Sequence, residues 1–147
     1  MTQSLEEEKE KYRFKLKLEV RWSDMDEMHH VNNAVYLTYL EQARIYYFGE
    51  AMKINWGEIS FILASAHIDY IKPLVFPNEA FVYVRVSKFG NKSFEMNYLV
   101  TGFENGIEKL SATGNTTLVM FDYKTNQTIV LPESLKETIK NYEPQKI

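Results

Sequence analysis

Hydrophobic and polar residues alternate without interruption from Arg13 to Trp22, which predicts a strand with one buried and one solvent-exposed face. A polar stretch follows, and then apolar and aromatic residues occupy every face of a helical segment from Val35 to Phe48. Such a helix is expected to be enclosed by other elements of the fold rather than to lie on its surface. Asn32 and Asn33 suit the N-cap of this helix, and Gly49 suits the position just after its end.

The rest of the chain repeats the strand pattern, with turns of hairpin length between the strands. The predicted strands cover residues 61–71, 80–87, 94–101, 107–121 and 127–130. Asn105 and Gly106 tolerate positive φ and predict a tight hairpin, and Gly114 predicts a bend in the long strand. Pro132 suits the first turn of a last helix, whose apolar stripe consists of Leu135, Ile139 and Tyr142.

This order of elements predicts an α+β fold in which an antiparallel sheet is wrapped round one long central helix. The chain has 147 residues without an internal repeat or a linker, so residues 1–147 are expected to form a single domain. The polar segment 1–11 is expected to be a frayed, solvated lead-in to the first strand.

Composition narrows the class of protein. The chain is 45% hydrophobic and 14% aromatic, which indicates a globular protein. It contains no cysteine, which excludes disulfides, thiolate nucleophiles and cysteine-ligated metals. The net charge of −3 disfavours nucleic acid as the main partner. The sequence shows no signal-peptide pattern and no apolar run of membrane-spanning length, so we expect a cytoplasmic protein without membrane association.

The polar stretch before the long helix concentrates side chains that can do chemistry. Between positions 24 and 33 it holds Asp24, Asp26, Glu27, His29, His30, Asn32 and Asn33. A carboxylate beside a helix start can act as a general base or as a nucleophile. The free backbone N–H groups of the helix start can stabilise a developing oxyanion. The alternative role for Asp26 is structural, as a charge that complements the helix dipole.

Three motifs occur in an order and at a spacing that resemble a known family. They are Asp24-x-Asp26 with Asn32-Asn33-x-x-Tyr36 and Glu41-x-Ala43-Arg44, then Ile68-Asp69-Tyr70-Ile71-Lys72-Pro73-Leu74, and finally Asp122-x-x-Thr125 with Leu131-Pro132-Glu133. With these motifs the chain resembles the 4-hydroxybenzoyl-CoA thioesterase-like acyl-CoA thioesterases, which have the hot-dog fold. The resemblance covers nearly the whole chain. The resemblance implies hydrolysis of acyl-CoA without a cofactor or metal, by a homodimer or homotetramer with its site at the subunit seam.

In that family the second aspartate of the pair is the usual catalytic carboxylate, which implies Asp26. The same run is similar to an Asp-x-Asn-x-His motif of plant acyl-carrier-protein thioesterases, whose positions here hold Asp26, Met28 and His30. Methionine cannot form the hydrogen bonds of asparagine, so Asp26 is the primary catalytic candidate and His30 the secondary one. For His30, a structural hydrogen bond is the alternative.

Four further residues are candidates for substrate binding. Asn33 caps the helix or orients the thioester carbonyl. Tyr36, in the first or second turn, is expected to contact the ligand, whereas the other aromatic residues of the helix are expected to be core. Lys88 and Lys92 lie on a turn and could meet the CoA phosphates through charge, the alternative being a solvated basic turn.

The remaining polar residues of note have structural interpretations. Asp24 is expected to shape the loop as an Asx residue, His29 to face solvent and His67 to be structural. A site for zinc or iron built from Asp24, Asp26, His29 and His30 is an alternative. It is disfavoured because adjacent histidine side chains usually diverge and no other histidine-rich segment completes the set.

Three other functions compete with acyl-CoA hydrolysis. A hydratase or dehydratase of β-hydroxyacyl thioesters shares the fold, but its His-Phe-Pro-Gly-type loop does not occur in this sequence. A non-catalytic module would bind acyl-CoA without turnover. A carrier-protein thioesterase would dock an acidic carrier protein, which the negative net charge of this chain disfavours.

Overall fold

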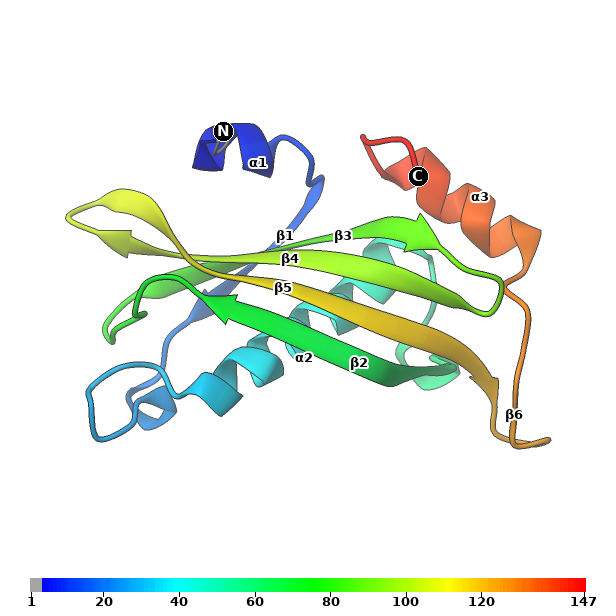
Figure 1. Ribbon diagram of the computed structural model, residues 1–147, viewed down its shortest axis with the longest axis horizontal. Helices are drawn as coiled ribbons and strands as arrows, with labels where there is room; N and C mark the ends of the chain where they lie inside the picture. The colour runs from blue at the N-terminus through cyan, green and yellow to red at the C-terminus, as the bar shows by residue number, and fades with distance from the viewer. Residues whose placement is uncertain (1–3) are drawn as a thin grey trace.

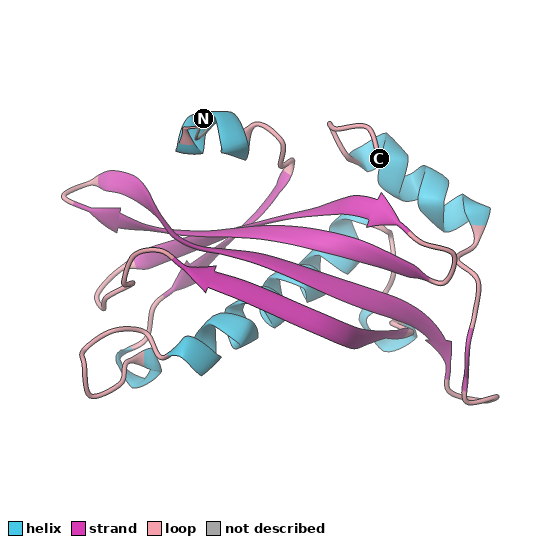
Figure 2. Ribbon diagram, viewed as in Figure 1, coloured by secondary structure: helices cyan, strands magenta, loops and turns pink. Residues whose placement is uncertain are grey.

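The computed structural model describes residues 4–147, and its central feature is one curved antiparallel sheet with a long helix along it (Figures 1 and 2). The strands are β1 Phe14–Glu19, β2 Phe61–Tyr70, β3 Glu79–Phe89, β4 Ser93–Glu104, β5 Ile107–Asp122 and β6 Gln127–Thr128. The helices are α1 Leu5–Lys9, α2 Asn33–Ala51 and α3 Glu133–Tyr142, with 3-10 turns η1 Trp22–Asp24 and η2 Trp56–Glu58. The strand order is β1-β3-β4-β5-β2, and β6 pairs with β5. The predicted α+β architecture is confirmed.

The core lies between α2 and the sheet. In Figure 1, α2 runs along the lower side of the sheet, and α1 and α3 lie at its upper side. Alternate residues of each strand face the helix, as the pleat of a strand requires. The fully buried members of this layer include Val82, Val84 and Val86 of β3, Phe94, Met96, Tyr98 and Val100 of β4, and Leu40 and Tyr47 of α2.

The helix α2 is covered by the sheet on one face only. Its buried face carries Tyr36, Tyr39, Leu40, Ala43, Arg44, Tyr47, Phe48 and Ala51. On the other face, Leu37 is 44% and Tyr46 56% exposed. The prediction that the helix is enclosed on all sides is therefore wrong for the single chain, because the sheet covers only the buried face of α2. Within residues 4–147, no helix combines the length and the apolarity needed to span a membrane.

The start of α2 was predictable from local chemistry and its end was not. Asn32 is the N-cap, and its side-chain oxygen accepts from the N–H of Ala34 at 2.8 Å. The predicted stop at Gly49 is wrong, because the helix continues to Ala51. Ala51 and the following Met52 are 1% and 4% exposed, so burying these two side chains carries the helix past an exposed glycine.

Strand boundaries differ from the alternating pattern where the chain turns. The alternation extends to Trp22, but β1 ends at Glu19 and Trp22 begins η1 with 74% of its surface exposed. The hairpin at Asn105 and Gly106 is confirmed, since their φ values are 53° and 76° and Glu104 pairs with Ile107 across the turn. Gly114 marks close packing, because a Cβ there would lie 3.1 Å from the Cδ1 of Leu40.

The lead-in to β1 is ordered over its described part. Residues 5–9 form α1, and Ser4 and Glu7 form a reciprocal capping box at its start. Lys9 donates to the carboxylate of Glu108 on β5 at 2.6 Å, which ties α1 to the sheet. The expectation of a frayed segment 1–11 is therefore wrong for residues 4–11, whereas residues 1–3 lie outside the described part of the chain.

Candidate active site

The segment between β1 and α2 folds back on itself and carries the candidate catalytic residues. An antiparallel bridge joins Met25 to Val31. Inside it, the N–H of Asp26 donates to the carbonyl of His30 at 2.9 Å, and the N–H of His29 donates back to the carbonyl of Asp26 at 3.0 Å. The turn is tight enough to place His29 at a φ of 60°. Asp26 and His30 are therefore held at the two sides of one short turn.

Asp24 is the buried carboxylate of this segment, with 1% of its surface exposed. One carboxylate oxygen accepts from Nε and Nη2 of Arg21 at 3.0 and 2.8 Å. The other accepts from the backbone N–H of Arg21 at 2.9 Å and from the hydroxyl of Tyr39 at 2.6 Å. Burial raises the pKa of Asp24, but the hydrogen bonds from Tyr39 and Arg21 outweigh it and hold the pKa below its usual range. These contacts agree with a structural role for Asp24.

Asp26 is half-buried and far less engaged. Its Oδ1 accepts from the N–H of Met28 at 2.9 Å, which is the geometry of an Asx turn. The Asx role that the sequence suggested for Asp24 thus belongs to Asp26. Among residues 4–147, no group donates a hydrogen bond to Oδ2 of Asp26. One carboxylate oxygen is therefore open to a water molecule or a substrate.

The first turn of α2 presents a backbone donor beside this loop. The N–H of Ala34 is taken by the side chain of Asn32, and the N–H of Val35 donates to the carbonyl of Asn32 at 2.9 Å. The N–H of Asn33 donates to no acceptor within residues 4–147. An unpaired N–H at the positive end of a helix is suited to bind a developing negative charge.

A cleft of about 240 Å³ joins the helix start to the end of β2. Its lining consists of His30, Val31, Asn33 and Tyr36 from the loop and helix, and of Tyr70, Ile71, Lys72 and Pro73 from the end of β2. The hydroxyl of Tyr70 donates to the carbonyl of Asn33 at 2.9 Å, and the rings of Tyr70 and Tyr36 meet edge to face with centroids 5.1 Å apart. Burial raises the pKa of Tyr36 to about 12, so its hydroxyl keeps its proton. The structure therefore brings His30, Asn33 and Tyr36 together, with the turn of Asp26 adjoining them.

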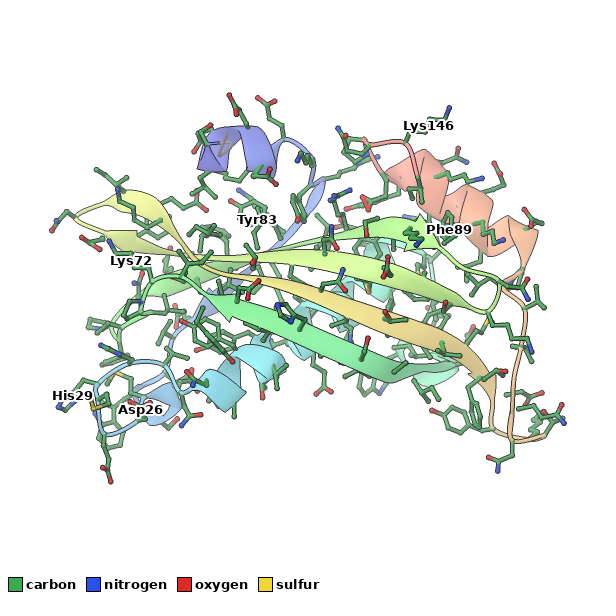
Figure 3. The ribbon with its side chains drawn as sticks, viewed as in Figure 1. Asp26, His29, Lys72, Tyr83, Phe89 and Lys146 are labelled. Carbon is green, nitrogen blue, oxygen red and sulfur yellow. The ribbon has the colours of Figure 1, made fainter. Side chains whose placement is uncertain are left out.

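The two predicted phosphate-binding lysines are not part of this cleft. Lys88 and Lys92 flank the β3–β4 turn, where Lys88 lies opposite Glu95 and Nζ of Lys92 lies 3.4 Å from Oγ1 of Thr128. Figure 3 shows Asp26, His29 and Lys72 at one end of the molecule and Phe89, the neighbour of Lys88, towards the other. Within one chain, the length of the sheet separates these lysines from Asp26, so a role for them in binding the CoA phosphates stays a prediction.

Lys72 is a positively charged residue that lines the cleft, and it was not among the site residues predicted from the sequence. It forms an ion pair with Glu104 at 2.6 Å, in which both side chains are partly exposed. Its position directly before Pro73, at the end of a strand, was visible in the sequence. That this strand end lies beside the start of α2 depends on the register of β2 against β5, which no local pattern reveals.

The other candidate residues lie away from the cleft. His67 is exposed on β2, and its Nε2 lies 3.0 Å from the carboxylate of Asp69. Of the aromatic residues of α2, Tyr39, Tyr47 and Phe48 are buried in the core as expected, and Tyr46 is exposed. No group of three or more histidine, aspartate or glutamate side chains among residues 4–147 is arranged to hold a metal ion.

Two apolar cavities open beside the C-terminal half of α2. The larger, of about 770 Å³, lies between β1, α2 and η2, and its apolar lining includes Phe14, Leu16, Ile45, Tyr46, Ile54 and Trp56. The smaller, of about 270 Å³, lies towards β2 and shares Ile45 and Trp56 with the first. These cavities give α2 an accessible apolar side at some distance from the cleft.

Comparison with known proteins gives consistent matches. A model of the thioesterase-like superfamily matches residues 20–139. A thioesterase from Thermus thermophilus, solved in complex with coenzyme A and zinc, is 35% identical with a TM-score of 0.83, and the match covers 94% of this chain and 99% of that one. The long-chain acyl-CoA thioesterase FadM of Escherichia coli K12 is 27% identical over 126 residues, which are 84% of this chain and 94% of that protein.

A more distant structure extends the comparison of the fold. A 4-hydroxybenzoyl-CoA thioesterase variant in complex with 4-hydroxybenzoyl-CoA has a TM-score of 0.78 at 15% identity, with 86% of this chain and 97% of that one covered. At this identity the likeness bears on the fold alone. Together with the superfamily match, it confirms the predicted hot-dog fold and the resemblance read from the three motifs.

Proposed function

The chain belongs to the thioesterase-like superfamily, and from this membership we propose that it hydrolyses acyl-CoA to the free acid and CoA, with Asp26 as the catalytic carboxylate and the start of α2 as the oxyanion site. The observation that carries the proposal is that two groups, a carboxylate oxygen and a backbone N–H of the same segment, have no hydrogen-bond partner within residues 4–147. They are Oδ2 of Asp26 and the N–H of Asn33, which lie on the same loop and helix start. A base or nucleophile beside an oxyanion donor is what thioester cleavage requires.

The reaction follows from the chemistry of these two groups. Asp26 either takes a proton from a water that attacks the thioester carbon, or attacks that carbon itself and forms a mixed anhydride that water then opens. In both routes the carbonyl oxygen becomes negative, and the N–H of Asn33 with the dipole of α2 stabilises it. One such donor contributes roughly 3 kcal/mol in comparable enzymes. In the first route the protonated Asp26 returns its proton to the departing sulfur, and in the second the CoA thiolate takes a proton from solvent, so that CoA is released as the thiol and the acid as the carboxylate.

His30 and Tyr36, which line the cleft, have supporting roles in this proposal. His30 lines the cleft and shares the turn of Asp26, which supports a role for its imidazole in holding a water or the thioester rather than in replacing the carboxylate. Tyr36 forms part of the cleft wall. The acyl chain is proposed to lie along the apolar side of α2, where two cavities open. The coenzyme A complex of the related Thermus thermophilus thioesterase supports coenzyme A as the thiol.

The assembly is proposed to be a homodimer or homotetramer, as the resemblance implies. The edge strand β2 supports this, since most of its residues are exposed, including Ile62 and Leu63. An exposed edge strand with apolar residues is a template for pairing with another chain. The exposed face of α2 is a second apolar surface that another chain could cover, because Leu37 and Tyr46 lie on it.

The test of the catalytic assignment compares two neighbouring carboxylates. Asp26→Asn is expected to fold normally and to lose most of the hydrolysis of acyl-CoA, because the amide can act neither as a base nor as a nucleophile. Glu27→Gln is the matched control, since Glu27 lies on the same turn, and it is expected to retain the wild-type rate. Asp26→Asn with full activity would remove Asp26 from the mechanism. Wild-type protein that binds acyl-CoA without turnover would favour the binding-module alternative, and carrier-protein thioesters would be the next substrates.

A further inference from the structure

Asp24 is buried and joins three parts of the candidate site, which are the segment after β1, the N-cap of α2 and the second turn of α2. Its side chain binds the backbone and guanidinium of Arg21 just after β1, and the hydroxyl of Tyr39 in the second turn of α2. Its backbone carbonyl accepts from the N–H of Asn32, the N-cap of α2, at 2.9 Å. The loop that contains Asp26 therefore begins at Asp24 and ends at Asn32, which is hydrogen-bonded to Asp24.

Asp24 is unable to act on a substrate itself. A carboxylate has about four lone-pair positions. In this structure, the two oxygens of Asp24 accept two hydrogen bonds each, three from Arg21 and one from Tyr39. With 1% of its surface exposed, Asp24 also has no room for a further ligand. Its full complement of donors contrasts with the open Oδ2 of Asp26 two residues later.

Tyr39 is the donor that couples Asp24 to the helix. It is 5% exposed, and its hydroxyl lies 2.6 Å from Asp24, the shorter of the two bonds to that oxygen. Burial and the neighbouring carboxylate both raise the pKa of Tyr39, so the hydroxyl stays a donor at any working pH. Arg21 is largely exposed, with 71% of its side-chain surface accessible, so solvent screens its ion pair with Asp24. The buried bond between Tyr39 and Asp24 is therefore the rigid member of the set.

We propose that Asp24 and Tyr39 are positioning residues, which act through Asp26 by fixing the carboxylate loop against the oxyanion N–H of Asn33. Because the ends of the loop are tied to one buried residue and that residue is tied to the body of α2, the distance between the two reacting groups is set by this contact. The proposal rests on the function proposed above for Asp26. A displacement of about 1 Å between reacting groups can lower a rate by about 100-fold.

The variant that tests this is Tyr39→Phe, which removes one hydroxyl and keeps the buried ring. Its kcat for acyl-CoA hydrolysis is expected to fall by about 10- to 100-fold with little change in KM, since the misplaced groups act on the transition state. Tyr47→Phe is the matched control. Tyr47 is a buried tyrosine of the same helix whose hydroxyl donates to a carboxylate, that of Glu143, at 3.1 Å, two turns further along α2. It is expected to keep the wild-type kcat.

Two further measurements separate positioning from loss of stability. In the Asp26→Asn background, adding Tyr39→Phe is expected to have no further effect on the residual rate, because Tyr39 acts through the removed carboxylate. Amide hydrogen exchange of residues 25–32 is expected to quicken in Tyr39→Phe and to stay unchanged in Tyr47→Phe.

The outcomes distinguish this proposal from the one on which it rests. If Asp26→Asn is inactive while Tyr39→Phe keeps the wild-type kcat, positioning by Tyr39 is refuted and the catalytic assignment stands. If wild-type protein hydrolyses no acyl-CoA, the catalytic assignment fails and positioning for that reaction fails with it. Unchanged exchange of the loop in Tyr39→Phe would show that the contact does not hold the loop at all, whatever the activity.

Discussion

Glu143 is a buried carboxylate whose titration should dominate the pH dependence of stability near neutrality. It follows α3 and is 8% exposed. Its Oε2 accepts from the N–H of Val86 at 2.7 Å and from the hydroxyl of Tyr47 at 3.1 Å. The pairing of β1 with β3 ends at Val84, so the N–H of Val86 has no partner on β1. The carboxylate of Glu143 accepts its hydrogen bond instead. Within residues 4–147, Oε1 has no partner.

The direction of the effect follows from the two pKa values. Burial raises the pKa of Glu143 from 4.5 to about 7, although the donors Val86 and Tyr47 and the nearby arginines partly oppose it. Between these two values the folded protein holds a proton that the unfolded chain has released. The free energy of unfolding therefore falls as pH rises through this window. The stabilisation is full below pH 4.5 and lost above pH 7.

The size of the effect is set by the difference in pKa. A rise from 4.5 to about 7 corresponds to about 3 kcal/mol, at about 1.36 kcal/mol for each pKa unit. This is an upper bound, because a charged Glu143 can draw in water when it loses its proton. A change of about 2–3 kcal/mol is a large share of the stability of a domain, which is about 5–15 kcal/mol.

The assay is urea denaturation of wild type and Glu143→Gln at pH 4.5, 5.5, 6.5 and 7.5, at one protein concentration. The wild-type free energy of unfolding minus that of Glu143→Gln is expected to fall by about 2–3 kcal/mol across this range, because the amide does not titrate. Subtraction removes the contributions of all other groups. Glu137→Gln, on an exposed carboxylate of α3, is the control and should follow the wild type. Parallel curves for wild type and Glu143→Gln would refute the reasoning.

Two further predictions concern packing and assembly. Gly102→Ala should lower the free energy of unfolding by about 1–3 kcal/mol, since its Cβ would lie 2.4 Å from Cδ1 of the buried Leu74. Gly57→Ala, whose Cβ meets nothing within 4 Å, should leave it nearly unchanged, and equal losses in both would contradict the packing argument. Light scattering should give the mass of a dimer or tetramer of the 17.3 kDa chain, and a monomer would overturn the proposed assembly.

Features of the chain that are set locally could be predicted from the sequence. Asn32 was recognised as a cap because its bond to Ala34 spans two residues. The hairpin at Asn105 and Gly106 was recognised because only a few residue types adopt its backbone. The capping box of Ser4 and Glu7 was equally local and was overlooked, although the spacing of serine and glutamate is its known signature.

Features that depend on distant parts of the chain could not be predicted. Helix α2 passes Gly49 because the residues beyond it are buried by the sheet. Lys9 is held by Glu108, which is 99 residues away, and this contact orders the N-terminal segment. The charge of Lys88 and Lys92 suits a phosphate, but it does not indicate that the length of the strands puts them at the other end of the sheet from Asp26. The charge of a residue indicates what it can bind, whereas its position in the fold depends on the length and pairing register of the strands.

Asp24 combines a feature that the sequence addresses locally with one that depends on a more distant residue. The sequence predicts Asp24 as a loop-forming Asx residue, whereas in the structure the Asx contact belongs to Asp26, and Asp24 binds Arg21 and Tyr39. The sequence did not reveal that Tyr39, fifteen residues later, is the partner of Asp24. Helical spacing indicates which residues share a face, but it does not indicate which of them meets the preceding loop.

The most direct test of the central claim is a thiol-release assay of wild type, Asp26→Asn and Glu27→Gln on short, medium, long and aromatic acyl-CoAs. Hydrolysis of at least one acyl-CoA by wild type and by Glu27→Gln, together with its loss in Asp26→Asn, is the predicted result. It would establish thioester hydrolysis by the carboxylate beside the start of α2. Release of CoA at the wild-type rate by Asp26→Asn, or no release by wild type from any substrate, would contradict the proposed function.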